Sequence, residues 1–119
     1  MRLIIAYIQP ETLMDVKQAL FNNGIVKMSV TNALGCAAES GFHEKYRGAD
    51  VQIDLLKKVR LEVALREENV DKTIDIIISH ARTGTPDLSG DLGDGKIFIL
   101  PILDCVRIRT GERGAIAVE

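Results

Sequence analysis

The chain has 119 residues, of which 46% are hydrophobic and 27% charged, and its formal net charge is −2. This composition is typical of one globular domain and excludes wholesale disorder. The small negative charge and the scarce aromatic residues argue against a nucleic-acid-binding protein. The apolar runs are too short to span a bilayer, the N-terminus lacks a signal-peptide cleavage pattern, and Cys36 and Cys105 have no metal-ligand spacing. We therefore expect a cytoplasmic protein with reduced thiols.

The first part of the chain predicts a strand, a helix and a second strand. Residues 2–8 are mostly apolar, as in a strand that is covered on both faces. Pro10 opens a helix, and Gly24 ends it as a glycine cap. Residues 25–34 then show a second strand pattern.

Residues 35–57 interrupt this regular pattern. They combine small, turn-forming residues with mixed charges and few bulky anchors. Because a loop of this length in a compact domain is either functional or disordered, we interpret it as a mobile projection that contacts another molecule.

The second part of the chain predicts another strand, helix and strand. Residues 59–65 alternate between apolar and polar, and Asn69 is expected to cap a helix that continues to Ala81. Strands are predicted for residues 96–100 and, as an additional C-terminal strand, for residues 105–109.

This order of elements predicts an α+β domain of the ferredoxin-like βαββαβ type, with two helices on one face of an antiparallel sheet. Residues such as Tyr7, Val30 and Val63 are expected to leave the other face apolar. Since a chain of this length has no third layer, oligomerisation through the sheets is the expected cover.

A glycine-rich stretch, Gly93-Asp94-Gly95-Lys96, directly precedes the predicted strand 96–100. Glycine amides can form an anion-binding nest, and a lysine at its end adds a charge suited to phosphate. On a strand, Arg107 and Arg109 would share one face and could converge on one anion. Lys96 is followed by Ile97, so this is not a Walker A loop. An ordinary glycine turn before an edge strand remains the alternative.

Four ordered motifs make the chain resemble the PII signal-transduction family over nearly its whole length. They are Tyr46-Arg47-Gly48-Ala49-Asp50, Ala81-Arg82-Thr83-Gly84, Gly93-Asp94-Gly95-Lys96-Ile97-Phe98 and Arg107-Ile108-Arg109-Thr110-Gly111-Glu112. The resemblance implies a cytoplasmic homotrimer that binds ATP or ADP between subunits and controls a target protein, a transporter or metabolic enzyme linked to nitrogen or carbon status. It implies a protruding T-loop at about residues 37–55, a phosphate-binding B-loop at about 82–96 and a C-terminal loop at about 110–119.

The resemblance also implies the residues of a nucleotide site. These are Ser29, Gly35, Glu39, Lys58, Glu62, Ala64, Arg82, Thr83, Gly93, Asp94, Gly95, Lys96, Arg107 and Arg109. Among them, the two arginines are expected from a neighbouring subunit, and Ala64 would contribute through its backbone. The resemblance assigns no catalytic residue and no resident metal site, although magnesium would accompany ATP.

The chain departs from the family at several positions. Val51 stands where uridylylated members carry a tyrosine, and Ala49 stands where some members are phosphorylated on serine. Glu39 replaces a glutamine that contacts 2-oxoglutarate in typical members, so we expect weak or absent 2-oxoglutarate binding although Lys58 remains. Residues 85–90 form an insertion in the B-loop.

Three functions follow from these patterns. The first is a regulatory sensor of ATP and ADP that acts through its T-loop. The second is a slow ATPase, for which no general base stands out in the sequence. The third is a trimeric interaction or metal-binding protein that needs no nucleotide.

Overall fold

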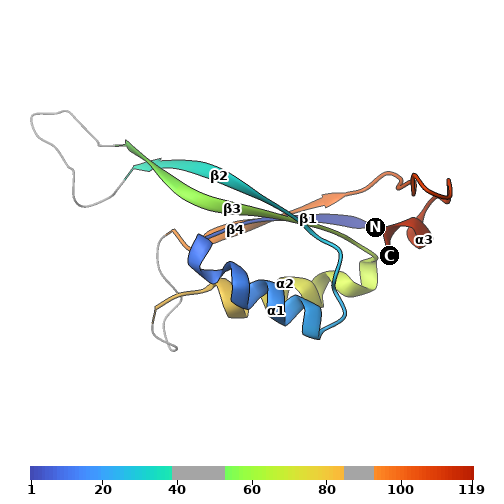
Figure 1. Ribbon diagram of the computed structural model, residues 1–119, viewed down its shortest axis with the longest axis horizontal. Helices are drawn as coiled ribbons and strands as arrows, with labels where there is room; N and C mark the ends of the chain where they lie inside the picture. The colour runs from blue at the N-terminus through green and yellow to red at the C-terminus, as the bar shows by residue number, and fades with distance from the viewer. Residues whose placement is uncertain (39–52, 85–92) are drawn as a thin grey trace, which may run out of the picture.

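The computed structural model describes residues 1–38, 53–84 and 93–119 (Figure 1). Its elements in chain order are β1 (Arg2–Ile8), η1 (Pro10–Thr12), α1 (Leu13–Asn22), β2 (Ser29–Ala38), β3 (Ile53–Leu65), η2 (Glu67–Asn69), α2 (Val70–Ala81), β4 (Gly95–Pro101) and α3 (Ala115–Val118). The strands form one antiparallel sheet in the order β2-β3-β1-β4. Helices α1 and α2 lie side by side on one face of this sheet (Figure 1). The predicted ferredoxin-like fold is therefore confirmed.

The core lies between the sheet and these two helices. Every second residue of β1 and β3 points toward the helices, as the period of a strand requires. The buried residues on these two strands are Ile4, Ala6, Ile8, Val59, Leu61, Val63 and Leu65. They pack against Val16 and Leu20 of α1 and Ile77 of α2. Full burial of a side chain such as Leu61 contributes about 1.5–3 kcal/mol, so this layer holds the helices on the sheet.

The opposite, open face of the sheet differs in composition from the prediction. Tyr7 lies on this face, but Val63 is only 2% exposed and belongs to the core beneath the helices. Val30 pairs with Leu61 and so also points toward the helix side. The expected face was wrong for these two valines, because Val63 alternates in phase with the buried Val59 and Leu61, and Val30 lies opposite Leu61. The open face is nevertheless apolar, because Leu3 lies opposite Leu100 and Ile5 lies opposite Phe98.

Strands β2 and β3 form a long hairpin that projects beyond the helices at one end of the sheet (Figure 1). The hairpin was predicted to be shorter, with strand ends at residues 34 and 59. Pairing continues to Ala38 and begins at Ile53, so the break predicted at residue 35 was wrong. Backbone pairing compensates for the low strand propensity of the glycine and alanines in residues 35–38. The predicted T-loop therefore includes both ends of the hairpin, and its residues 39–52 lie outside the described residues.

The helices begin and end close to their predicted positions. Helices α1 and α2 are each preceded by a 3-10 turn, and Gly24 adopts a φ of +82° just after α1, as a glycine cap does. Asn69 does not act as the predicted side-chain cap. Its backbone oxygen instead accepts a hydrogen bond of 2.7 Å from the Thr73 hydroxyl. No helix in the described ranges is long and apolar enough to cross a membrane.

The segment after β4 does not form the predicted strand at residues 105–109. Val106 and Arg113 make an isolated antiparallel bridge around a turn, and the chain continues into α3. Both chain ends lie at the end of the sheet opposite the projecting hairpin (Figure 1). The C-terminal segment and the glycine-rich loop therefore lie at opposite ends of the sheet.

Gly95 is the position where the fold tolerates no side chain. Its φ is +110°, and a Cβ there would lie 1.7 Å from the backbone oxygen of Tyr7. We expect Gly95→Ala to lower the free energy of unfolding by more than about 2 kcal/mol, because both backbone strain and overlap with the main chain oppose it. Gly24→Ala is the control, since Gly24 has a φ of +82° with open space around it and should lose only about 1–2 kcal/mol. Urea unfolding of both variants measures the difference, and equal losses would contradict this account.

Candidate functional site

The B-loop is anchored by the carboxylate of Asp94. Its Oδ2 accepts a hydrogen bond of 2.9 Å from the backbone N–H of Thr83, and its Oδ1 accepts one of 2.6 Å from the Thr83 hydroxyl. Gln9 donates to the same Oδ1 at 2.9 Å. This carboxylate therefore joins the segment after α2, the segment after β1 and the start of β4. Arg82 is exposed where α2 ends, and residues 85–92, which include the predicted insertion, lie outside the described residues.

Lys58 connects this loop to the hairpin. Its ammonium donates a hydrogen bond to the backbone oxygen of Gly93. Gly35 lies beside it, because a Cβ on Gly35 would be 3.2 Å from Cγ of Lys58. The predicted residues Gly35, Lys58, Gly93, Asp94 and Gly95 are thus close together in the structure.

Lys96 completes this set of residues, which we call the phosphate-side group after the role that the family resemblance implies. It is exposed at the start of β4, opposite Tyr7 on the open face of the sheet. Gly93 and Gly95 both have positive φ, so their amides can take orientations that residues with a side chain rarely allow. Within the described residues, the group therefore combines two exposed glycines with two lysine ammonium groups, a composition suited to an anion.

A groove of about 470 Å³ adjoins this group between α2 and β4. Arg82, Asp94 and Lys96 line its polar end, and isoleucines such as Ile74 and Ile99 line the rest. This apolar wall was not predicted, since its isoleucines follow ordinary core periodicity and carry no separate signal.

A second pocket, of about 450 Å³, brings together three other predicted residues: Ser29, Glu62 and Ala64. Ser29 lies opposite Glu62 in the pairing of β2 with β3, and Leu3 lies opposite Ala64 in the pairing of β1 with β3. Lys27, Met28 and Val118 complete the pocket but were not predicted. Val118 could not have been found by spacing, because it is far from the others in sequence.

Arg60 is a further residue that sequence reasoning did not single out as part of the site. Its Nη2 lies 2.5 Å from Oε2 of Glu62, and its guanidinium lies 5.9 Å from the centre of the Tyr7 ring. Residues two apart on a strand share a face, which is the signal that could have predicted this pair. Arg60 fixes the carboxylate of Glu62 at the rim of the pocket.

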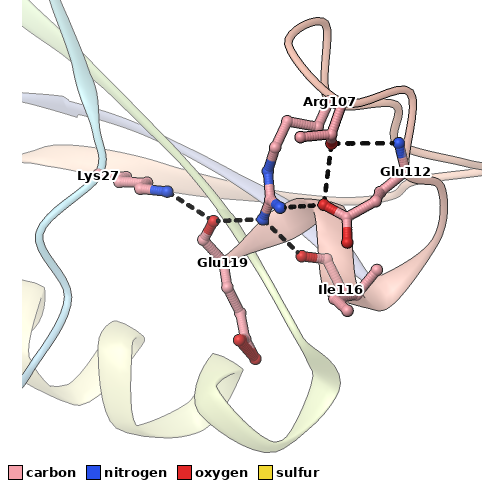
Figure 2. Close-up of polar contacts among 6 residues, drawn as sticks. Lys27, Arg107, Glu112, Ile116 and Glu119 are labelled. Carbon is pink, nitrogen blue, oxygen red and sulfur yellow. Dashed lines mark hydrogen bonds and ion pairs between the residues drawn. The ribbon is translucent and has the colours of Figure 1, made fainter.

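Arg107 does not stand ready for an external anion in the described structure. Its guanidinium pairs with the Glu112 carboxylate and donates to the backbone oxygens of Ile116, at 2.8 Å, and Glu119, at 3.3 Å (Figure 2). Arg109 lies in the exposed turn that follows. The two arginines do not share a strand face as predicted, because the chain turns at residues 108–110. Arg107 instead has acceptors within its own C-terminal segment.

Apart from Arg107, Arg109 and Glu39, the predicted site residues separate into two groups in one chain. The phosphate-side group lies near Lys58, where the hairpin leaves the sheet. The base-side group of Ser29, Glu62 and Ala64 lies at the other end, next to the C-terminal segment. The separation along β3 from Lys58 to Glu62 and Ala64 is about 13–20 Å at the usual rise of a strand. Glu39 lies outside the described residues and joins neither group.

These features define a small ferredoxin-like α+β domain with a glycine-rich loop and a projecting hairpin. A sequence profile described as "Nitrogen regulatory protein P-II" matches residues 1–112. The chain belongs to the nitrogen regulatory protein P-II family, whose members act in signal transduction. The sequence-based resemblance to this family is confirmed.

Individual relatives agree with this assignment. The chain is 46% identical to "Nitrogen regulatory protein P-II 1" of Methanothermobacter thermautotrophicus over 118 residues, which cover 99% of this chain and 97% of that protein. It is 45% identical to "Nitrogen regulatory protein P-II 2" of the same organism, with the same coverage. A crystal structure of Arabidopsis thaliana PII bound to citrate matches with a TM-score of 0.74 and 32% identity, covering 99% of this chain and 89% of that one. The two archaeal relatives are named as regulatory proteins and not as enzymes, in agreement with the sequence-based expectation.

Asp94 provides a test of how the B-loop is held. We expect Asp94→Ala to lower the free energy of unfolding by about 1–3 kcal/mol, because it leaves the donors of Gln9 and Thr83 without this acceptor. Asp75→Ala, on an exposed position of α2, removes a carboxylate without these bonds and should have little effect. Urea unfolding monitored by circular dichroism measures both, and equal midpoints for Asp94→Ala and the unaltered protein would contradict the anchoring role.

Proposed function

We propose that this protein is a homotrimeric sensor that binds ATP or ADP between two copies of the chain and controls a target protein through its hairpin segment. The observation that carries this proposal is the separation of the predicted nucleotide residues into two groups at opposite ends of the sheet. Each group is a partial site, and a neighbouring copy can bring the base-side group of one chain to the phosphate-side group of another.

The phosphate-side group fits the charge of a nucleotide. Lys96 and Lys58 supply ammonium groups, and the glycines at 93 and 95 allow a phosphate to approach the backbone closely. A related PII is described as bound to citrate, itself a polyanion, which agrees with anion binding on this fold.

The base-side group fits the other end of the ligand. Its pocket combines the apolar side chains of Leu3 and Met28 with the hydroxyl of Ser29 and the carboxylate of Glu62. Ligand pockets are commonly of this kind, with mainly apolar walls and a few polar groups that fix orientation. Magnesium would arrive with ATP, and no step of the proposal depends on a protein ligand for it.

The open face of the sheet supports a trimer. Leu3, Ile5, Phe98 and Leu100 form an apolar strip along β1 and β4, and the rings of Tyr7 and Phe98 are in edge-to-face contact at 6.2 Å. Phe98 is 46% exposed in the single chain. Covering such a strip with a second copy removes apolar surface from water, which is the usual driving force for association.

The ATPase alternative is weaker, because Asp94, the carboxylate in the described part of the B-loop, is engaged by Thr83 and Gln9. The third alternative, a trimer that does not bind nucleotide, is tested by thermal unfolding with and without ATP or ADP, since a ligand that binds only the native state raises its melting temperature.

The likeness to PII regulators does not identify the target protein. The expected classes are a transporter or a metabolic enzyme linked to nitrogen or carbon status. A pull-down with and without ADP would identify the target.

The first prediction from this proposal concerns assembly. Light scattering at micromolar concentration should give the mass of three chains, because both the apolar open face and the divided site require neighbours. Phe98→Asp places a charge in that face and should reduce the mass toward one chain. A monomer for the unaltered protein would contradict the proposal.

The second prediction concerns the nucleotide. Lys96→Ala should weaken ATP binding at least about tenfold, because a charge-assisted hydrogen bond contributes about 1.5–3 kcal/mol. Lys17→Ala, on α1, removes the same charge away from both groups and serves as the control. Titration calorimetry measures both affinities, and an unchanged value for Lys96→Ala would exclude this lysine from the site.

The third prediction concerns 2-oxoglutarate. Weak or absent binding is expected in the presence of Mg-ATP, because Glu39 would place a carboxylate beside an anionic ligand. Like charges at about 4 Å repel by about 4 kcal/mol at the effective dielectric of a protein site. Glu39→Gln should therefore increase 2-oxoglutarate affinity in calorimetry. Micromolar affinity of the unaltered chain would show that this interpretation of Glu39 is wrong.

A further inference from the structure

The C-terminal segment, residues 112–119, contacts Arg107, which the family resemblance assigns to the nucleotide site. Arg107 pairs with the Glu112 carboxylate and also donates to the backbone oxygens of Ile116 and Glu119 (Figure 2). The Arg107 side chain is only 28% exposed as a result. These acceptors are oxygens, as a phosphate group also presents, so the segment satisfies Arg107 in the way an anionic ligand would.

Glu119 is held by two further basic side chains. Lys27 donates to its backbone oxygen at 2.7 Å (Figure 2), and Nη2 of Arg66 lies 2.6 Å from its Oε2. Lys27 precedes β2 and Arg66 follows β3, so three cationic side chains from different parts of the chain converge on the last residue of the segment. Such a cluster of like charges is stabilised by the anion between them.

The segment also borders the base-side pocket. Val118 lines the same pocket as Ser29, Glu62 and Ala64, so α3 lies across part of the surface proposed for the nucleotide base. A ligand that uses both this pocket and Arg107 therefore meets the C-terminal segment at both places.

The part of the segment that makes this contact is separable from its anchor. Arg113 pairs with Asp104 at 2.6 Å, which lowers the pKa of that carboxyl, and the backbone N–H of Gly114 donates to the oxygen of Cys105. The turn up to Gly114 is thus fastened to β4's continuation by its own bonds. Residues 115–119, which lie beyond the stretch matched by the family profile, are held through Arg107, Lys27 and Arg66.

We infer that residues 115–119 form an internal latch that competes with the nucleotide for Arg107, while Glu112 pairs with Arg107 from the anchored turn. The latch rests on the proposed nucleotide function and adds a regulatory step to it: the segment must release Arg107 before the arginine can hold phosphate. The apparent affinity for nucleotide is then reduced by the fraction of molecules whose latch is closed. A partner or ligand that binds the released segment would raise nucleotide affinity by the same coupling.

The test compares ATP affinity in the full chain and in a chain that ends at Gly114. We expect the shortened chain to bind ATP about fivefold more tightly or better, at the lower end of typical coupling between sites. Glu119→Gln removes the carboxylate that Arg66 holds but keeps the backbone acceptor, so it should increase affinity by a smaller factor. Glu68→Gln makes the same charge change at an exposed position of η2 and is the control, with affinity unchanged.

A second measurement follows the latch itself. The amide of Ala117 in α3 donates to the backbone oxygen of Gly114, the residue before this helix. If ATP opens the latch, hydrogen exchange of the Ala117 amide should become faster when ATP is added to the full chain. If the shortened chain fails to fold, Arg66→Gln loosens Glu119 in the full chain and should raise ATP affinity in the same direction.

The outcomes separate the two proposals. Equal or weaker ATP binding after removal of residues 115–119 overturns the latch while leaving nucleotide binding intact. Slower exchange of Ala117 with ATP would likewise overturn it, because the segment would then close over the ligand. Absence of ATP binding in both the full and the shortened chain would overturn the proposed nucleotide function, and the latch with it.

Discussion

The carboxylate of Asp94 joins the two described ends of the B-loop, residues 82–84 and 93–96. Asp94 accepts hydrogen bonds from Gln9 after β1 and from Thr83 after α2, and it immediately precedes the close approach of Gly95 to Tyr7. These contacts determine where β4 enters the sheet and therefore where the amides near Gly93 and the ammonium of Lys96 lie. Because these contacts hold residues 93–96 in place, an anion that bound there would require little reorganisation of them.

Much of the fold could be predicted because local pattern and tertiary structure agree. The apolar run of β1 and the alternation along β3 match the burial of Ile4 and Leu61, and the apolar stripe of α2 buries Ile77. The hairpin was underestimated because residues 35–38 have loop-like composition, and only their pairing with β3 makes them a strand. The C-terminal strand was overestimated because alternation alone cannot reveal that Arg107 has acceptors in its own chain.

The candidate site was predictable in its members but not in its arrangement. Resemblance to a family proposes residues such as Lys58 and Glu62 position by position, and the structure shows Lys58 bonded to Gly93 and Glu62 in the lining of a pocket. It could not show that Arg60 orders Glu62, or that α3 lies against the base-side pocket, because those relations join residues through the fold. The division into two groups likewise becomes visible only when strand register assigns each residue to one end of the sheet.

Lys58 is part of the hairpin and also contacts the glycine-rich loop. Its backbone pairs with Ala33 in β2, while its ammonium is bonded to Gly93. A paired two-stranded ribbon bends and twists as a unit, because its backbone hydrogen bonds link the two strands at every step. An anion that displaced the Lys58 ammonium from Gly93 would therefore act where the hairpin joins the rest of the sheet. Because the ribbon is stiff, a small rotation at this position would move its far end by a larger distance.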